Sequence, residues 1–353
     1  MTAPSTVPVP FPSRSGAAPG GRFLVVKGSG GAGLGDKVRA VISAIVYARL
    51  SGRTLYVDWN DPAYGDGEGN YFDALFSLVG IETTSERPAG GCVRPPVWQD
   101  KLHLSWDRLY AEQGTPPWNR SMAMQMYSFD QGVLDWPEDV CVMWDFDQFP
   151  KLRPYLPSLY ASIRGHESQE WQQGEVLRRH LVPGVAVREG MHPYLQRLET
   201  SRPCVGVHVR AADEHFRLRA ALPVSAYVKA VRTIMRRSGA RTLFLATDNA
   251  DVQELFAAEF GREHVLWTEK WLPEAGVALH LANACPDRQQ SARDALLDIL
   301  LLASADYLVT AGTSSFSILA RLFSTVPEQR RVTLMWKCPL WKRVWRRLGW
   351  SSE

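Results

Sequence analysis

The sequence lacks any long apolar stretch. In its 353 residues no run approaches the roughly 18 uninterrupted apolar residues that a membrane-spanning helix needs. The segment from Met1 to Gly21 is rich in Pro, Ser, Gly and Ala, and it lacks the basic start and apolar core of a secretory signal. We therefore expect a cytoplasmic protein in which residues 1–21 form a flexible leader.

Charge of one sign and clustered cysteines are also scarce. The formal net charge is +3, which is small beside the basic surface that dominates most nucleic-acid-binding proteins. The five cysteines are scattered and form no C-x-x-C pair of the kind that holds zinc or carries redox chemistry. We predict reduced cysteines, no metal site and no nucleic-acid partner.

What the sequence does have is ordinary globular composition, with 45% apolar and 22% charged residues. A chain of this length is too long for one small core and suits two α/β domains. In the second half, strands at Val205–Val209, Thr242–Ala246 and Tyr307–Thr310 alternate with helical patterns, which predicts a parallel sheet covered on both faces. Ligands of such sheets bind beyond the carboxyl ends of the strands.

The first glycine-rich segment follows a predicted strand at Phe23–Val26. Residues 28–33 fit the pattern G-x-G-x-x-G, and Asp58 closes the next strand where a ribose-binding acid would lie. Taken alone, this pattern favours an NAD(P)-dependent oxidoreductase, although the glycines can also serve only a tight turn. We expect the following helix to begin with Asp36 as its N-cap, three residues beyond the last glycine of the fingerprint.

The second segment of interest is the end of the strand Val205–Val209. His208 and Arg210 stand two residues apart and therefore point to the same side of an extended chain. A guanidinium can donate to two oxygens of a diphosphate, and it would stabilise a departing nucleoside diphosphate without a metal. The alternative is an ion pair of Arg210 with Asp213 or Glu214 and a histidine that only fills the sheet face.

Two further strands end in polar residues. Phe244–Asn249 contains Thr247 and Asp248, and a carboxylate there could accept N–H groups from a guanine edge or could cap the next helix. After the strand at 307–310, Ser314 and Ser315 could bind phosphate, although serine at a helix N-cap is the commoner reason for such a turn.

Together, in order and spacing, these segments resemble the fucosyltransferase superfamily that includes the rhizobial nodulation protein NodZ, α1,6-fucosyltransferases and protein O-fucosyltransferases. The segment Gly33-Leu34-Gly35-Asp36 and residues 51–59 resemble NodZ most, and residues 208–213 are similar to the family's H-x-R-R-x-D segment. The resemblance covers most of residues 23–59 and 181–323. It implies two facing Rossmann-like domains of GT-B type and a metal-independent, inverting glycosyltransferase.

The resemblance also implies a domain division and a pair of substrates. Residues 22–180 would form the acceptor-side α/β domain, 181–325 the Rossmann-like domain that binds a GDP-sugar, and 326–353 a basic, Trp-rich tail. The donor would be GDP-fucose or a related GDP-sugar, and the acceptor would be a glycan.

Site residues follow from the same resemblance, position by position. His208 and Asp248 would contact guanine, Arg210 the β-phosphate, and Ser314 or Ser315 the phosphates. The full set of expected donor-binding residues is Gly33, Leu34, Gly35, His208, Arg210, Asp213, Thr247, Asp248, Asp298, Thr313, Ser314 and Ser315. Arg210 is also expected to be catalytic, and Ala211 stands where many members carry a second arginine. The acid proposed as general base in some members has no match after Asp213, so the base is unassigned, with Asp36 and Glu214 as candidates.

Three interpretations stay open beside this one. The chain could be the oxidoreductase described above, or a nucleotide- or sugar-binding module without turnover, since Ala211 and the unassigned base depart from the family. Tryptophans of the weakly periodic segment could stack on sugars or pack in the core; they are Trp98, Trp106, Trp118, Trp136 and Trp144. The tail from Trp336 to Trp350 could lie on anionic lipid as a peripheral contact or dock on the protein body.

Overall fold

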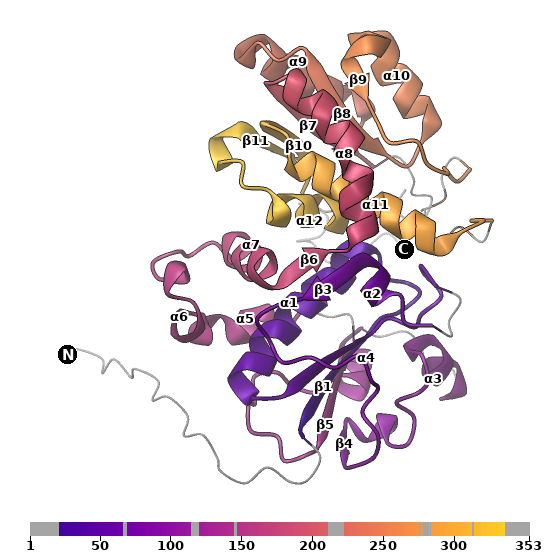
Figure 1. Cartoon of the computed structure of the whole chain (residues 1–353), viewed down its shortest axis with the longest axis vertical. Coiled ribbons are helices and arrows are strands. Elements are labelled where there is room, and N and C mark those ends of the chain that lie inside the picture. Colours follow the sequence, from indigo (N-terminus) through magenta and orange to yellow (C-terminus); the bar gives the residue numbers. More distant parts are fainter. Residues whose placement is uncertain are drawn as a thin grey trace, which may run out of the picture.

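The first half of the chain folds around a parallel sheet of four strands in the order β2-β1-β5-β4 (Figure 1). The structure is a computed structural model that describes residues 21–65, 69–113, 120–144, 147–210, 222–274, 277, 282, 284–312 and 314–335. The strands of this first sheet are β1 (Phe23–Lys27), β2 (Thr54–Asp58), β4 (Val93–Arg94) and β5 (Val140–Trp144).

Helix α1 (Leu34–Ser51) connects β1 to β2 and completes the β-loop-α-β unit that the sequence predicts. Gly52 ends the helix in a left-handed conformation at φ 64°, which a side chain would disfavour. The helix begins at Leu34 with Gly33 as N-cap, so the prediction that Asp36 caps it was wrong. Asp36 lies instead in the first turn, where a carboxylate is favoured by the helix dipole.

The second half folds around a parallel sheet of five strands in the order β11-β10-β7-β8-β9. Its strands are β7 (Cys204–Val209), β8 (Thr242–Thr247), β9 (Val265–Leu266), β10 (Tyr307–Ala311) and β11 (Arg331–Leu334). Its helices are α8 (Val185–Thr200), α9 (Val224–Ser238), α10 (Ala250–Phe260), α11 (Arg288–Ala303) and α12 (Ser315–Phe323). Strand β11 lies in the segment that the sequence assigns to the tail, so the second sheet extends past residue 325.

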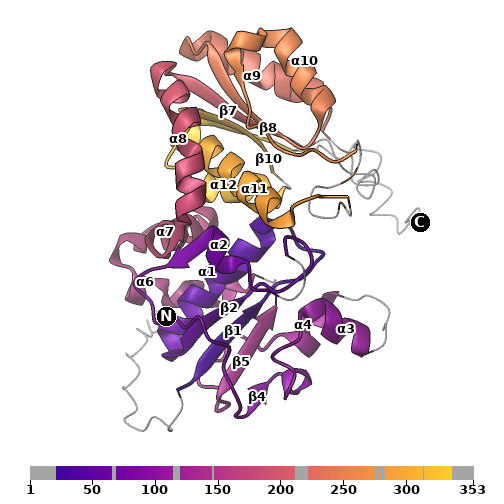
Figure 2. The ribbon, with the colours of Figure 1, turned by 45° about the vertical axis from the view of Figure 1, so that its right-hand side comes forward.

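Short elements link the two sheets. The strands β3 (Phe76–Leu78) and β6 (Leu181–Pro183) pair in antiparallel fashion, and β6 leads into α8. The remaining helices of the first half are α2 (Phe72–Leu75), α3 (Trp106–Glu112), α4 (Arg120–Tyr127), α5 (Phe149–Leu152), α6 (Leu156–Leu159) and α7 (Gln169–His180). Figure 2 shows α8 rising from this region into the second half, where it packs against α11.

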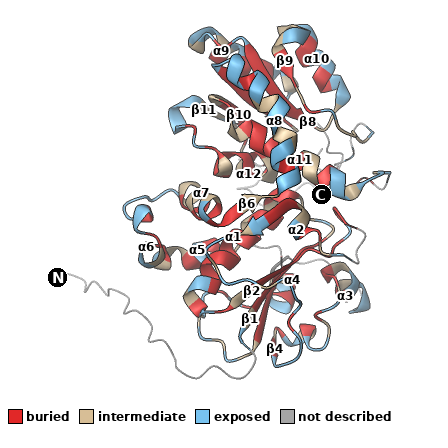
Figure 3. Cartoon of the chain, viewed as in Figure 1, coloured by how far each residue is buried: buried red, intermediate tan, exposed pale blue. Residues whose placement is uncertain are grey.

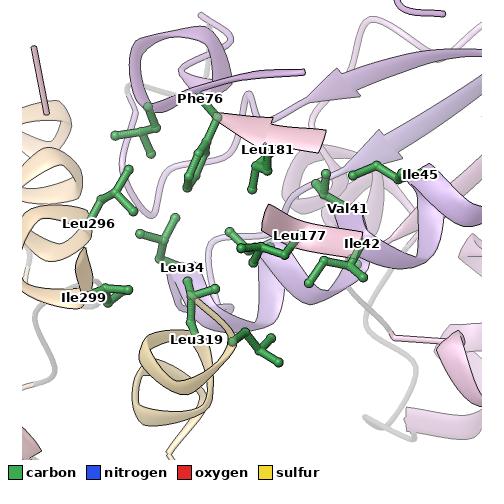
Figure 4. Packing of buried hydrophobic residues seen from close by; sticks show 14 of the residues in the cluster. Leu34, Val41, Ile42, Ile45, Phe76, Leu177, Leu181, Leu296, Ile299 and Leu319 are labelled. Atoms are coloured by element: carbon green, nitrogen blue, oxygen red, sulfur yellow. The ribbon is translucent and has the colours of Figure 1, made fainter. Parts of the chain in front are cut away.

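One apolar core joins the two halves. Helix α12 of the second half packs on α1 and α7 of the first, and the cluster includes Leu34, Leu177 and Leu319, which converge in Figure 4. At its rim, Arg321 of α12 donates to both carboxylate oxygens of Glu170 in α7. Figure 3 shows the result: α1 is buried almost throughout, while α9 and α10 expose their outer faces. The halves are therefore held in one arrangement by shared packing.

The tryptophans of the first half belong mainly to packing. Trp98, Trp106 and Trp144 are at most 7% exposed, and the rings of Trp106 and Trp144 stack with centroids 4.1 Å apart. Trp136 is half-buried, and the guanidinium of Arg94 lies 4.0 Å from its ring. Trp118 lies outside the described residues. Core packing therefore explains these rings better than sugar stacking does.

Candidate functional site

The carboxyl ends of β7, β8 and β10 meet at one edge of the second sheet. Because these strands are parallel and adjacent, His208, Thr247 and the turn after Ala311 stand side by side. Helix α12 begins at that turn and points its N-terminus at the same edge. The topology thus brings together residues that the sequence separates by about a hundred positions.

His208 is enclosed at this edge. Its Nδ1 lies 2.7 Å from the hydroxyl of Ser317, which also accepts the amide N–H of Ala311, and its ring stacks on Phe316 with centroids 4.4 Å apart. Burial first of all, and then the charges of Arg210 and Lys270, lower the pKa of His208 to about 3. The imidazole is therefore neutral at pH 7, and it gives the site a polar surface without a positive charge.

Arg210 follows β7 directly and is half-buried. Its charge acts on His208 in the second half and on Tyr64 in the first half, where burial raises the pKa of the phenol and Arg210 opposes that rise. Arg210 therefore stands between the two halves. Residues 211–221, with Asp213 and Glu214, lie outside the described residues.

The start of α12 meets the start of α1. Ser314 is the N-cap of α12, since its hydroxyl accepts the amide N–H of Ser317. A Cβ on Gly35 would lie 2.2 Å from the carbonyl oxygen of Ser315, so only glycine lets the two helices come this close. The N-termini of α1 and α12, which carry partial positive charge, thus meet where the two halves contact each other. Thr313 lies outside the described residues.

The residue that caps the helix after β8 is not Asp248, which one interpretation of the sequence assigned to that role. Asn249, rather than Asp248, caps α10, because its side-chain oxygen accepts the amide N–H of Val252 at 3.0 Å. The hydroxyl of Thr247 is buried and has no hydrogen-bond partner within the described part of the chain. A buried hydroxyl in that state costs free energy unless a ligand satisfies it.

Asp298 lies in α11 and contacts Lys270, a residue that the sequence did not indicate as part of the site. Its carboxylate accepts the hydroxyl of Thr268 at 2.6 Å and forms a buried ion pair with Lys270. Lys270 is 5% exposed and acts on His208 through its charge. The segment 267–270 has no regular structure and carries no motif, so only the fold could reveal this lysine.

The glycine-rich segment of the first half is satisfied internally. The amide N–H of Gly30 donates to the carboxylate of Asp107, and Lys37 donates to Asp61 and to the carbonyl of Ser29. Asp58 is fully buried and ion pairs with Lys27. A carboxylate already occupies the loop, and a ribose has no access to Asp58, which speaks against the dinucleotide interpretation.

Two further observations concern metals and membranes. Within the described ranges, no group of three or more His, Cys, Asp or Glu residues is placed to hold a metal ion. Among the helices described, none is long and apolar enough to cross a membrane. The basic tail from Trp336 onward is outside the described part of the chain.

Known proteins resemble this chain in sequence. Nodulation protein Z of Bradyrhizobium diazoefficiens is 25% identical over 315 residues, which span 83% of this chain and 77% of that protein. The α-(1,6)-fucosyltransferase of Drosophila melanogaster is 27% identical over 199 residues, or 52% of this chain and 31% of the fly protein. No family model matches the chain. The resemblance to the NodZ-like fucosyltransferases is confirmed.

The fold agrees with that resemblance. A crystal structure of NodZ α-1,6-fucosyltransferase soaked with GDP-fucose superposes with a TM-score of 0.55 at 19% sequence identity, covering 86% of this chain and 93% of that one. The predicted architecture of two facing Rossmann-like halves, of GT-B type, is thereby confirmed.

Proposed function

We propose that the chain is an inverting, metal-independent fucosyltransferase that transfers fucose from GDP-fucose to a hydroxyl group of a glycan. The observation that carries the proposal is the convergence of His208, Arg210 and the N-terminus of α12 at one edge of the second sheet. NodZ, the relative with this fold, has been crystallised with GDP and soaked with GDP-fucose.

Each part of the donor would find a complementary group. The diphosphate suits Arg210 and the amides at the start of α12, because a guanidinium and helix N-terminal N–H groups both bind phosphate oxygens. The guanine suits the neutral His208 together with polar groups such as Asp298 and Thr247, since it carries both donors and acceptors. These contacts support a GDP-sugar over a donor without a diphosphate.

The chemistry would be a direct displacement. An acceptor hydroxyl attacks the anomeric carbon while GDP leaves, and negative charge builds on the β-phosphate. Arg210, placed between the halves, would stabilise that charge without a metal ion. The acceptor would approach from the first half, opposite the departing GDP.

A ligand panel tests the nucleotide, because a ligand that binds only the native state raises its stability by about 2.7 kcal/mol at one hundred times its Kd. We expect GDP and GDP-fucose to raise the melting temperature, and UDP-sugars and NAD to leave it unchanged. A response to NAD instead would restore the oxidoreductase interpretation.

A transfer assay tests turnover. We expect GDP to be released from GDP-fucose only when a glycan acceptor is present, at a rate that EDTA does not change. GDP binding without any acceptor-dependent release across a glycan panel would favour the non-catalytic module. Loss of the activity in EDTA would contradict the metal-independent mechanism.

A further inference from the structure

Asp107 occupies an unusual place in the first half. It lies in the first turn of α3, and both of its carboxylate oxygens accept the amide N–H of Gly30, at 3.0 and 3.1 Å. A carboxylate has about four lone-pair sites, so this one amide leaves most of its acceptor capacity unused. Its side chain is half-buried and so still reaches solvent.

The neighbouring acids of this sheet edge are committed to cations. Asp58 pairs with Lys27, Asp61 pairs with Lys37, and Asp36 lies 3.9 Å from Arg39. Asp107, by contrast, has no cation at ion-pair distance among the residues that the structure describes. Of these carboxylates, Asp107 is therefore the one whose oxygens are not held by a cation within the described residues.

The charge environment of Asp107 agrees with its geometry. Burial raises the pKa of Asp107 above its usual value, the amide of Gly30 lowers it, the charge of Asp61 raises it and that of Lys37 lowers it. The net direction is upward, as a proton acceptor working near neutral pH requires.

Asp107 also lies close to the boundary between the halves. A Cβ on Gly30 would lie 3.0 Å from Oδ1 of Asp107 and 2.8 Å from Cγ of Pro62. The carbonyl of Pro62 accepts a hydrogen bond from Arg288 at the start of α11, at 2.8 Å. Tyr64 lies two residues farther along the same loop, and the charge of Arg210 acts to lower the pKa of its phenol. Asp107 thus lies beside the first-half loop that contacts the start of α11 in the second half.

We propose that Asp107 is the general base that activates the acceptor hydroxyl. The assignment rests on the proposed glycosyl transfer and names a residue for the role that the sequence left to Asp36 or Glu214. Asp107 takes the proton of the acceptor hydroxyl as that oxygen bonds to the anomeric carbon. The bond from the anomeric carbon to the β-phosphate oxygen breaks, and GDP leaves with the electron pair. Asp107 then releases the proton to water.

The first test compares Asp107→Asn with Asp36→Asn and Asp130→Asn. Asn keeps the shape and can still accept the Gly30 N–H, so we expect Asp107→Asn to lower kcat by 10²- to 10⁴-fold, the range for general-base catalysis, with an unchanged Kd for GDP. The exposed Asp130, which pairs with Lys151, is the matched control and should keep wild-type kcat. Wild-type kcat in Asp107→Asn, or a large loss only in Asp36→Asn, would overturn the assignment.

The second test separates proton removal from support of the glycine-rich segment. Azide is a nucleophile that carries no proton at neutral pH, so it needs no base. With Asp107→Ala we expect azide to restore turnover of GDP-fucose at least tenfold and to yield a glycosyl azide. Azide should leave wild-type turnover of the glycan acceptor unchanged. Failure of azide to rescue a folded, GDP-binding variant would mean that Asp107 is structural.

The pH profile provides an independent measurement. Wild-type kcat/KM should fall as the pH drops through the pKa of Asp107, whose proton competes with catalysis, and Asp107→Asn should lack this acidic limb. The charged groups facing Asp107 are Asp61 after β2 and Lys37 in α1. An unchanged acidic limb would contradict the assignment and leave the proposed function intact. Absence of both GDP binding and transfer in the wild type would overturn both.

Discussion

The chain contains two strand-turn-helix units that differ in which of their polar groups already have partners. The turn between β1 and α1 has its Gly30 amide bound to Asp107 and its Lys37 paired with Asp61. The turn between β10 and α12 lies at the sheet edge that carries Thr247, whose hydroxyl has no partner among the described residues. Because N–H groups bind phosphate only while they remain available, we expect the second turn, and not the first, to bind the donor phosphates.

The largest expected effect is a loss of stability, caused by a change in the first half that leaves donor binding unchanged. Replacing Asp58 with Asn leaves Lys27 buried without its counter-charge, which should cost about 3 to 5 kcal/mol of unfolding free energy. Urea unfolding measures this loss, and the GDP affinity of the folded fraction should stay unchanged. Asp130→Asn, at an exposed ion pair, should cost less than about 1 kcal/mol. A large drop in GDP affinity for Asp58→Asn would move the donor site to the first half.

The next effect tests the second half. Arg210→Ala should lower the transfer rate by about 10²- to 10³-fold, because it removes charge stabilisation that exists mainly in the transition state. Its melting temperature without ligand should stay close to wild type. Arg210→Lys keeps the charge but loses the fork of donors, so it should recover only part of the rate. A wild-type rate in Arg210→Ala would remove Arg210 from the site.

The titration of His208 should give the free energy of unfolding a pH dependence of intermediate size. Its pKa is about 3 in the folded protein, so the unfolded chain binds a proton below about pH 6.5 that the folded protein does not. Its contribution to stability is complete above that pH and is lost as the pH falls toward 3, by about 2 kcal/mol at pH 5. Urea unfolding of wild type and His208→Gln from pH 7 to 5 measures the difference in slope.

The control for that comparison is the exposed His192→Gln, which should follow the wild-type slope. An identical slope for His208→Gln and wild type would show that the imidazole can take up a proton in the folded protein. The description of His208 as an uncharged polar surface of the site would then be wrong.

The smallest expected effect concerns the cap of α12. Ser314→Ala should cost about 1 kcal/mol of stability and weaken GDP binding several-fold, because the N-cap hydroxyl orders the first turn. Ser168→Ala removes the equivalent cap of α7, whose hydroxyl accepts the amide of Trp171, and should cost similar stability without changing the GDP affinity. Equal GDP affinities in both variants would exclude α12 from the donor site.

The architecture could be predicted from sequence because it depends on local patterns. The alternation of apolar strands and helical patterns located β7, β8 and β10. Helix caps were predicted less well, because Gly33 rather than Asp36 caps α1, and Asn249 rather than Asp248 caps α10. Asn249 lies next to the expected residue, whereas Gly33 lies three residues before it, which is the scale on which helix ends escape sequence patterns.

The site could be predicted only in part. The sequence pattern predicts that His208 stands near the carboxyl end of a strand, and the structure places it there, whereas the contacts of Lys270 and Asp107 join distant segments that carry no local pattern. A buried ion pair such as Lys270 with Asp298 forms only after the strands have set the positions of their loops. Pairings of this kind require the fold itself.

The contact between Gly35 and Ser315 also bears on how the chain folds. These residues stand near opposite ends of the sequence, yet α1 buries its apolar face partly against α12. Contacts between such distant segments form late, because the loop that they close is long. During synthesis, the surface around Leu34 stays exposed until α12 has left the ribosome. The first half would thus depend on the last helix for its final cover, and a truncation before residue 315 should leave an aggregation-prone product.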